Sequence, residues 1–242
     1  MKRLDVIGFG PGSIKGMTLE ARQAIEECDA VVGFATYIRL LQQYFIDKEY
    51  YSNGMGGEVE RTRQALELAA AGRHVALVCS GDSQVYGLAG LAYELGMEYP
   101  DVEIHTIAGV TAALSGSAIL GAAAGNDLCT ISLSDYHTSW EAIEDRLAAC
   151  AACDFVIALY NPRSKARPDT LRRACDVLLQ HIEPDRPCGV AKNIGRTGQQ
   201  ALVMTLEELR DYEADMFSTV FIGNSKTRII GDHLVTPRGY LD

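Results

Sequence analysis

Residues 4–12 read LDVIGFGPG, a short apolar run followed by a turn with glycine at Gly8, Gly10 and Gly12. An apolar run of this length that ends at glycine predicts a buried β-strand. A glycine turn follows a predicted strand twice more, in SGDSQVYG at 80–87 and in AGVTA at 108–112. We expect an α/β fold, in which loops at the carboxyl ends of strands bind ligands.

Helices and strands alternate along the rest of the chain. Thr18 is placed to cap a helix that ends near Glu27, and Gly72 to end a helix that begins near Val59. The pattern restarts after the segment Gly-Asn-Asp at 125–127. We therefore expect two α/β domains, 1–123 and 124–242, with a ligand cleft between them. The second domain is expected to hold strands at 129–133, 155–160, 188–191, 201–204 and 217–222, helices at 140–150 and 169–181, and a capping box that opens a short helix at 205–208.

Composition excludes several classes of protein. The 242 residues carry a net charge of -10 without a block of lysine and arginine, so no nucleic-acid partner is expected. No signal peptide and no membrane-spanning segment are predicted. Seven cysteines, an odd number, indicate reduced thiols and a cytoplasmic location. Cys150 and Cys153 have the spacing of a redox motif, but they follow a helical pattern, so we interpret them as structural.

Each glycine turn also has a plain structural interpretation. The first lacks the third glycine of a dinucleotide fingerprint, since Ser13 stands there, and Pro11 removes an N–H that a pyrophosphate would use. Asp82 could cap the following helix or bond its own loop. Thr111 fits the position of an N-cap. Any one turn can thus be purely structural, whereas three in one half of the chain favour a ligand site.

Together, GFGPG, SGDSQVYG and AGVTA resemble the conserved turns of the tetrapyrrole methylase family. The second half narrows the resemblance to the precorrin-3B or cobalt-precorrin-3 C-17 methyltransferases, through SLSDYHTSW, DFVIALYNPRS, NIGR, IGNSKT and VTPRGY. Ala108 stands where the family usually has proline, which should cost only some stiffness at that turn. The resemblance implies a two-domain α/β enzyme, usually a homodimer, that methylates a tetrapyrrole in cobalamin biosynthesis.

The resemblance also implies a methyl donor, S-adenosylmethionine, and residues that hold it. Carried over by motif, the donor-binding residues of the first domain are Pro11, Gly81, Asp82, Val85, Thr111 and Ala112, and those of the second are Tyr160, Asn161, Asn193 and Ile194.

The implied acceptor carries many carboxylates and therefore needs local positive charge. Cations on predicted loops of the second half are candidates, although each can also be an ordinary surface charge. The residues expected to bind the acceptor are Arg163, Lys192, Arg196, Lys226 and Arg238, with Lys165, Arg167 and Arg228 nearby in sequence.

Ring contraction, which accompanies C-17 methylation in this subfamily, needs proton transfer. Asp135, His137 and Thr138 follow a predicted strand and are candidate catalytic residues. An exposed histidine without a role is the alternative for His137. The remaining histidines are scattered singly, so no protein-bound metal is predicted, and any cobalt arrives within the substrate.

Three other functions stay open. A methylase that acts at another ring carbon would share the donor turns. A carrier that binds a tetrapyrrole without turnover would not need them. A generic nucleotide-dependent enzyme is disfavoured by Pro11 and Ser13.

Overall fold

A computed structural model describes residues 2–241 of the chain. The chain divides into two compact units, Met1–Ala112 and Ala113–Asp242. The sequence suggested a division after residue 123, but the helix that begins at Ala112 packs within the second unit: its Gly116 lies against Phe221 and Ala191.

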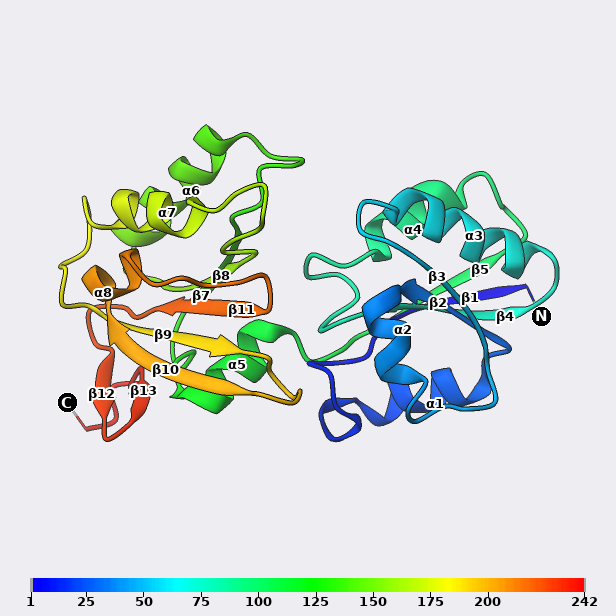
Figure 1. Cartoon of the computed structure of the whole chain (residues 1–242), viewed down its shortest axis with the longest axis horizontal. Helices are drawn as coiled ribbons and strands as arrows, with labels where there is room; N and C mark the ends of the chain where they lie inside the picture. Colours follow the sequence, from blue (N-terminus) through cyan, green and yellow to red (C-terminus); the bar gives the residue numbers. More distant parts are fainter. Residues whose placement is uncertain (1, 242) are drawn as a thin grey trace. The chain divides into compact units, whose positions relative to one another are not determined.

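The first unit is a parallel sheet of five strands in the order β3-β2-β4-β1-β5. Helices α1 and α2 cover one face and α3 and α4 the other (Figure 1). Each face buries its own apolar cluster, which includes Ile7 and Val78 on one side and Leu4 and Leu77 on the other. The elements are β1 (Arg3–Gly8), a 3-10 turn (Ile14–Gly16), α1 (Leu19–Glu27), β2 (Ala30–Phe34), α2 (Ala35–Leu41), β3 (Glu49–Asn53), α3 (Glu58–Ala70), β4 (His74–Cys79), α4 (Ala89–Gly96) and β5 (Glu103–Ile107).

The second unit contains a mixed sheet in the order β10-β9-β11-β8-β7, in which β7 pairs with β8 in parallel and the other three neighbouring pairs are antiparallel. A second sheet has the order β12-β13-β6. The elements are α5 (Ala112–Leu120), β6 (Gly121–Ala122), β7 (Leu128–Ser132), α6 (Trp140–Ala152), β8 (Val156–Tyr160), α7 (Thr170–Leu178), β9 (Pro187–Lys192), β10 (Gln200–Thr205), α8 (Leu206–Arg210), β11 (Ser218–Ile222), β12 (Arg228–Ile230) and β13 (His233–Val235).

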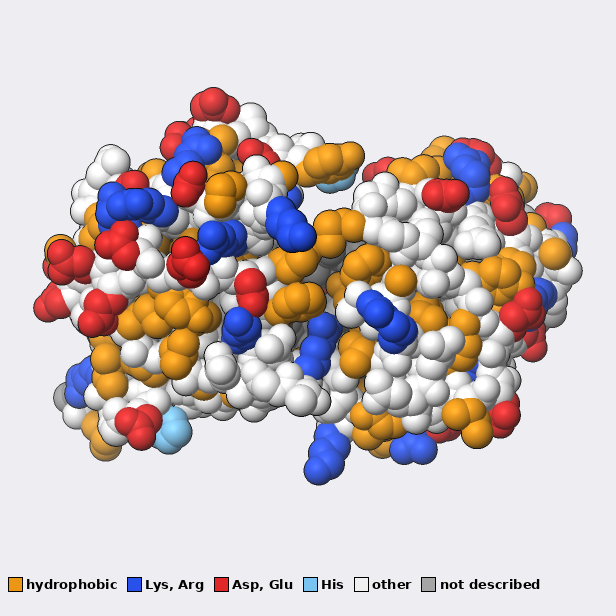
Figure 2. Space-filling model, viewed as in Figure 1, with side chains coloured by type: hydrophobic (Ala, Val, Ile, Leu, Met, Phe, Trp, Pro, Cys, Tyr) orange, Lys and Arg blue, Asp and Glu red, His pale blue; other side chains and the backbone are white. Residues whose placement is uncertain are grey.

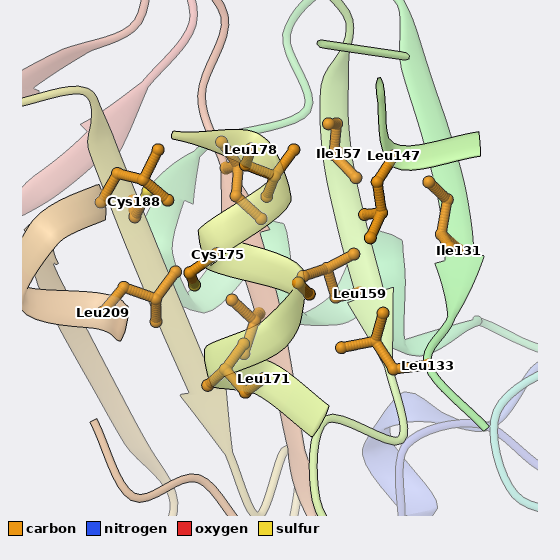
Figure 3. Packing of buried hydrophobic residues seen from close by; sticks show 14 of the residues in the cluster. Ile131, Leu133, Leu147, Ile157, Leu159, Leu171, Cys175, Leu178, Cys188 and Leu209 are labelled. Carbon is orange, nitrogen blue, oxygen red and sulfur yellow. The ribbon is translucent and has the colours of Figure 1, made fainter. Parts of the chain in front are cut away.

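One apolar cluster holds α6, α7 and α8 on the larger sheet of this unit. Leu171, Cys175 and Leu178 project from one side of α7 toward the strands, where Ile157 and Leu159 meet them (Figure 3). Full burial of a leucine contributes about 1.5–3 kcal/mol, so this face of α7 fixes the helix and the loop that precedes it.

The expected elements agree with the structure to within a few residues, including the Thr18 cap and the capping box of Thr205 and Glu208. Helix α2, strand β3 and strand β6 were not predicted. Strand β12, which follows Ile222, was not predicted either. Between residues 2 and 241, no helix is both long and apolar enough to span a bilayer.

Candidate functional site

The three glycine turns of the first unit lie together, because β4, β1 and β5 are neighbours in its sheet. Gly10 donates its N–H to the carbonyl oxygen of Gly81 at 3.0 Å, and Gly81 donates to that of Gly10 at 2.8 Å. The first and second turns are thus joined by a pair of backbone hydrogen bonds. We call the surface formed by the turns 8–12, 80–87 and 108–112 the turn platform.

The glycines of the platform leave no room for side chains between the turns. A Cβ on Gly109 would lie 2.1 Å from the carbonyl oxygen of Gly81 and 2.3 Å from that of Gly8. A Cβ on Gly8 would lie 2.7 Å from the backbone nitrogen of Ser83. Gly10 has φ +81°, a conformation that favours glycine. The three turns are therefore packed backbone against backbone.

Asp82 ties the second turn to the third. Its Oδ1 accepts hydrogen bonds from the backbone N–H groups of Gln84 (2.8 Å) and Val85 (3.0 Å), and its Oδ2 accepts one from Gly109 (2.9 Å). Burial of the carboxyl raises its pKa, but these N–H donors outweigh burial and hold the pKa below its usual value. The carboxylate therefore organises the platform from within.

Four of the donor-binding residues predicted in this unit are partly exposed on the platform, namely Pro11, Val85, Thr111 and Ala112. Gly81 and Asp82 are buried beneath them. A ligand on the platform would contact backbone groups and small side chains. Such a surface suits a methyl donor, because no large side chain keeps the donor away from the backbone. The residues present therefore fit the donor that the sequence implies.

The larger sheet of the second unit gathers most of the other predicted residues at one edge. Strands β7, β8 and β9 run in the same direction, since β9 and β8 are both antiparallel to the β11 between them. Their carboxyl ends carry the loops 133–139, 161–169 and 193–199. We call this the loop edge; it includes Asp135, His137, Thr138, Tyr160, Asn161, Arg163, Lys192, Asn193, Ile194 and Arg196.

Local hydrogen bonds fix the residues of the loop edge that are predicted to bind the methyl donor. The hydroxyl of Tyr160 accepts a hydrogen bond from the backbone N–H of Ala113 at 2.7 Å, at the start of α5. Asn161 and Asn193 have φ values of +54° and +50°. Their amides bond within the same edge, to Ser132 Oγ at 3.0 Å and to the carbonyl oxygen of Gly198 at 3.3 Å. Ile194 is buried, so its side chain mainly anchors its loop.

Arg167 holds the loop that carries the candidate catalytic residues. Its Nη1 donates to Ser134 Oγ at 2.7 Å and to Asp135 Oδ1 at 2.9 Å. Asp135 is thus already ion-paired. His137 is exposed and its ring meets that of Tyr136 edge-on, with 4.6 Å between centroids. The sequence presented Arg167 only as one loop cation among several, and its positioning role was missed.

Several candidate cations of the loop edge already have acidic partners. Lys192 Nζ lies 2.8 Å from Asp215, a hydrogen bond that raises the pKa of Lys192. Arg163 lies 3.6 Å from Glu213, a looser pair with an exposed carboxylate. Blue and red side chains intermingle over the second unit in Figure 2. Loosely paired Arg163 is therefore better placed than Lys192 to exchange its partner for a ligand.

Lys226 and Arg238 do not lie at the loop edge. Strand β11 runs antiparallel to β8 and β9, so the segment that follows it, with Lys226, lies at the opposite edge. There the backbone N–H of Gly223 bonds Pro187, at the start of β9. Arg238 follows Thr236, whose hydroxyl bonds the carbonyl oxygen of Ala123. The sequence offered both residues only as cations on predicted loops of the second half, without a strand direction to place them.

The cysteines are placed as the sequence suggested. Cys150 is within α6 and Cys153 is its exposed C-cap residue, so the pair does not open a helix as a redox motif would. Burial raises the pKa of Cys79 to about 11 and that of Cys175 to about 12. These thiols are neutral at physiological pH. Within residues 2–241, no three His, Cys, Asp or Glu side chains are arranged to hold a metal ion.

A family model described as Tetrapyrrole (Corrin/Porphyrin) Methylases matches residues 3–210. The chain belongs to this family. The probable cobalt-factor III C(17)-methyltransferase of Salmonella typhimurium (strain LT2) is 43% identical, over 98% of this chain and 99% of its own length. The cobalt-factor III methyltransferase of Priestia megaterium is 42% identical over 98% of this chain, but the match spans 45% of that relative.

Solved structures agree with this assignment. The crystal structure of the methyltransferase CobJ superposes with a TM-score of 0.88 at 35% identity, over 97% of this chain and 99% of that one. The expected fold, a two-domain α/β tetrapyrrole methylase, is confirmed, and so is the family. The roles of the individual site residues stay predictions.

Proposed function

We propose that this chain transfers a methyl group from S-adenosylmethionine to C-17 of a cobalt-factor III or precorrin-3B type tetrapyrrole, with contraction of the macrocycle, in cobalamin biosynthesis. Full-length similarity to a relative named as a cobalt-factor III C(17)-methyltransferase carries this proposal. Both relatives quoted above bear cobalt-factor III names, which favours an acceptor that already contains cobalt.

The turn platform is proposed to hold the methyl donor. Methyl transfer from a sulfonium is an in-line displacement: the acceptor carbon forms a bond to the methyl group as the bond from the methyl group to sulfur breaks, and the electron pair stays on sulfur. Such a step needs alignment and exclusion of water more than acid–base help. A backbone platform fixed by Asp82 and by the reciprocal bonds of Gly10 and Gly81 supplies a rigid seat.

The loop edge is proposed to contact the acceptor and to support ring contraction. Arg163, with its loose carboxylate partner, and Arg196 are the cations that we propose for the acceptor's carboxylates. His137 is exposed and has an unperturbed pKa range suited to proton transfer. Asp135 is held by Arg167, so we assign it to placing the loop, and Thr138 to hydrogen bonding.

Two properties rest on the family resemblance and on composition. We propose that the protein is a homodimer, as its family usually is, which sedimentation analysis would test. We also propose that it acts in the cytoplasm, in keeping with cysteines that are all free thiols.

The decisive experiment uses S-adenosylmethionine labelled with ¹³C in the methyl group and cobalt-factor III as acceptor. NMR of the product should place the label on C-17 of a contracted ring. Label on another ring carbon would refute C-17 methylation in favour of a different tetrapyrrole methylase. Binding of both ligands without transfer of label would instead support a carrier.

A further inference from the structure

Arg61 is a buried arginine whose guanidinium is largely unpartnered. It lies in the first turn of α3 with 3% of its surface exposed. Its Nη2 lies 3.4 Å from Glu58 Oε1, at the long limit of a hydrogen bond. Among the described residues, nothing bonds its Nε or Nη1, although both atoms are buried.

The surroundings of Arg61 offer one further unpartnered polar atom. The side-chain nitrogen of Asn53 and the backbone N–H of Arg61 both donate to the carbonyl oxygen of Gly57, each at 2.9 Å. Asn53 and Arg61 are therefore neighbours around that carbonyl. The side-chain oxygen of Asn53, Oδ1, is buried and has no hydrogen-bond partner within residues 2–241. The charge of Arg61 lies 5.8 Å from the ring centroid of Phe34.

These residues stand where strands of the first sheet end. Phe34, Asn53 and Cys79 are the last residues of β2, β3 and β4. Cys79 leads directly into the second turn of the platform, and its strand β4 is the neighbour of β2, whose last residue Phe34 contacts Arg61. Burial raises the pKa of the Cys79 thiol to about 11, and the charge of Arg61 offsets this only in part. Arg61 is thus at the ligand-bearing edge of a parallel sheet, beside the turn platform. The neutral thiol of Cys79 does not neutralise the guanidinium.

This arrangement is costly for the protein by itself. A buried hydrogen-bond donor left without a partner costs about 1–3 kcal/mol, and more when it belongs to a charged group. Buried charges in proteins are normally paired and fully hydrogen-bonded. Glu58 supplies one long contact from a half-exposed side chain. Two guanidinium donors therefore await an acceptor that the described chain does not provide.

We propose that Arg61 binds a carboxylate of a ligand of this enzyme through an unpartnered guanidinium N–H, at Nε or Nη1, beside an acceptor position at Asn53 Oδ1. A guanidinium presents its N–H donors in a fixed plane, an arrangement that the single ammonium group of lysine does not reproduce. The inference rests on the proposed function, because both substrates named there carry carboxylates. The carboxylate can belong to the amino-acid part of the methyl donor or to a side chain of the tetrapyrrole.

The test compares Arg61→Met with Arg63→Met in the full chain. Arg63 lies on the same helix but forms an exposed pair with Glu98, so its replacement controls for loss of charge on α3. Calorimetry measures the affinity for S-adenosylhomocysteine, and KM is measured for cobalt-factor III. Arg61→Met should either lower the affinity for S-adenosylhomocysteine or raise the KM for cobalt-factor III, by tenfold or more. Loss of affinity for S-adenosylhomocysteine identifies the donor carboxylate, and a raised KM alone identifies the acceptor.

Arg61→Lys provides a second variant should the methionine variant not fold. It keeps the charge but not the planar fork, and should show the same loss to a smaller degree. Wild-type values for both ligands in a folded Arg61 variant would overturn the inference. Failure of the proposed function looks different, because the wild-type protein itself would then bind neither S-adenosylhomocysteine nor cobalt-factor III.

Discussion

Replacing Gly109 by alanine should disrupt the turn platform. The added Cβ would lie 2.1 Å from the carbonyl oxygen of Gly81, whereas ordinary contacts begin near 3.4 Å, so the backbones must separate by more than an ångström. Forced overpacking of this kind costs about 1–3 kcal/mol. A displacement of about 1 Å in a substrate-positioning element can cost about 100-fold in rate. We expect affinity for S-adenosylhomocysteine to fall at least tenfold.

The assay combines calorimetric titration of S-adenosylhomocysteine with unfolding in urea, followed by circular dichroism. Gly90→Ala is the matched control: a Cβ at Gly90, in helix α4, meets nothing within 4 Å. Alanine there should stabilise the protein by as much as about 1 kcal/mol, through helix propensity, and leave binding unchanged. Wild-type affinity and wild-type stability in Gly109→Ala would refute the idea that closely packed backbones form the donor seat.

Three further predictions concern the remaining parts of the site. Asp82→Asn should lower the free energy of unfolding by about 2 kcal/mol at neutral pH. Because folding lowers the pKa of Asp82, its carboxylate stabilises the protein above about pH 4, and this contribution is lost as pH falls through the folded pKa. The free energies of unfolding of wild type and variant should therefore converge in acid. Arg167→Gln should release Ser134 and Asp135 and lower kcat about tenfold without changing affinity for S-adenosylhomocysteine; an unchanged kcat would contradict its positioning role. Arg163→Met should raise KM for the tetrapyrrole, whereas Lys226→Met, at the opposite edge of the sheet, should not; equal effects would contradict the placement of the acceptor.

The sequence predicted the first unit well where local signals were strong. The runs before Gly8 and Gly81 are short and mostly apolar. The structure leaves no room for a Cβ at Gly8 or Gly109, and it buries Gly81. Helix α2 and strand β3 gave weaker signals, because YYSN at 50–53 mixes polar and aromatic residues and Phe34 caps α2 without a side-chain bond. Position along the chain could not show that the three turns touch, which depends on strand order.

The site was harder to predict from the sequence than the fold, because its residues interact with partners that are distant along the chain. Asp82 is a plausible ligand contact in sequence, but the structure occupies its Oδ2 with an N–H from Gly109, 27 residues away. The antiparallel course of β11 moved Lys226 to the opposite edge, and no local pattern encodes strand direction. Arg61 resembles any other cation on an amphipathic helix until its burial and missing partners are known.

Calorimetric titration of the purified protein with S-adenosylhomocysteine, with NADH as the negative control, tests whether the turn platform binds the methyl donor. We expect saturable binding of one S-adenosylhomocysteine per chain, at least tenfold weaker in Gly109→Ala, and no binding of NADH. Failure of the wild-type protein to bind S-adenosylhomocysteine would contradict this expectation.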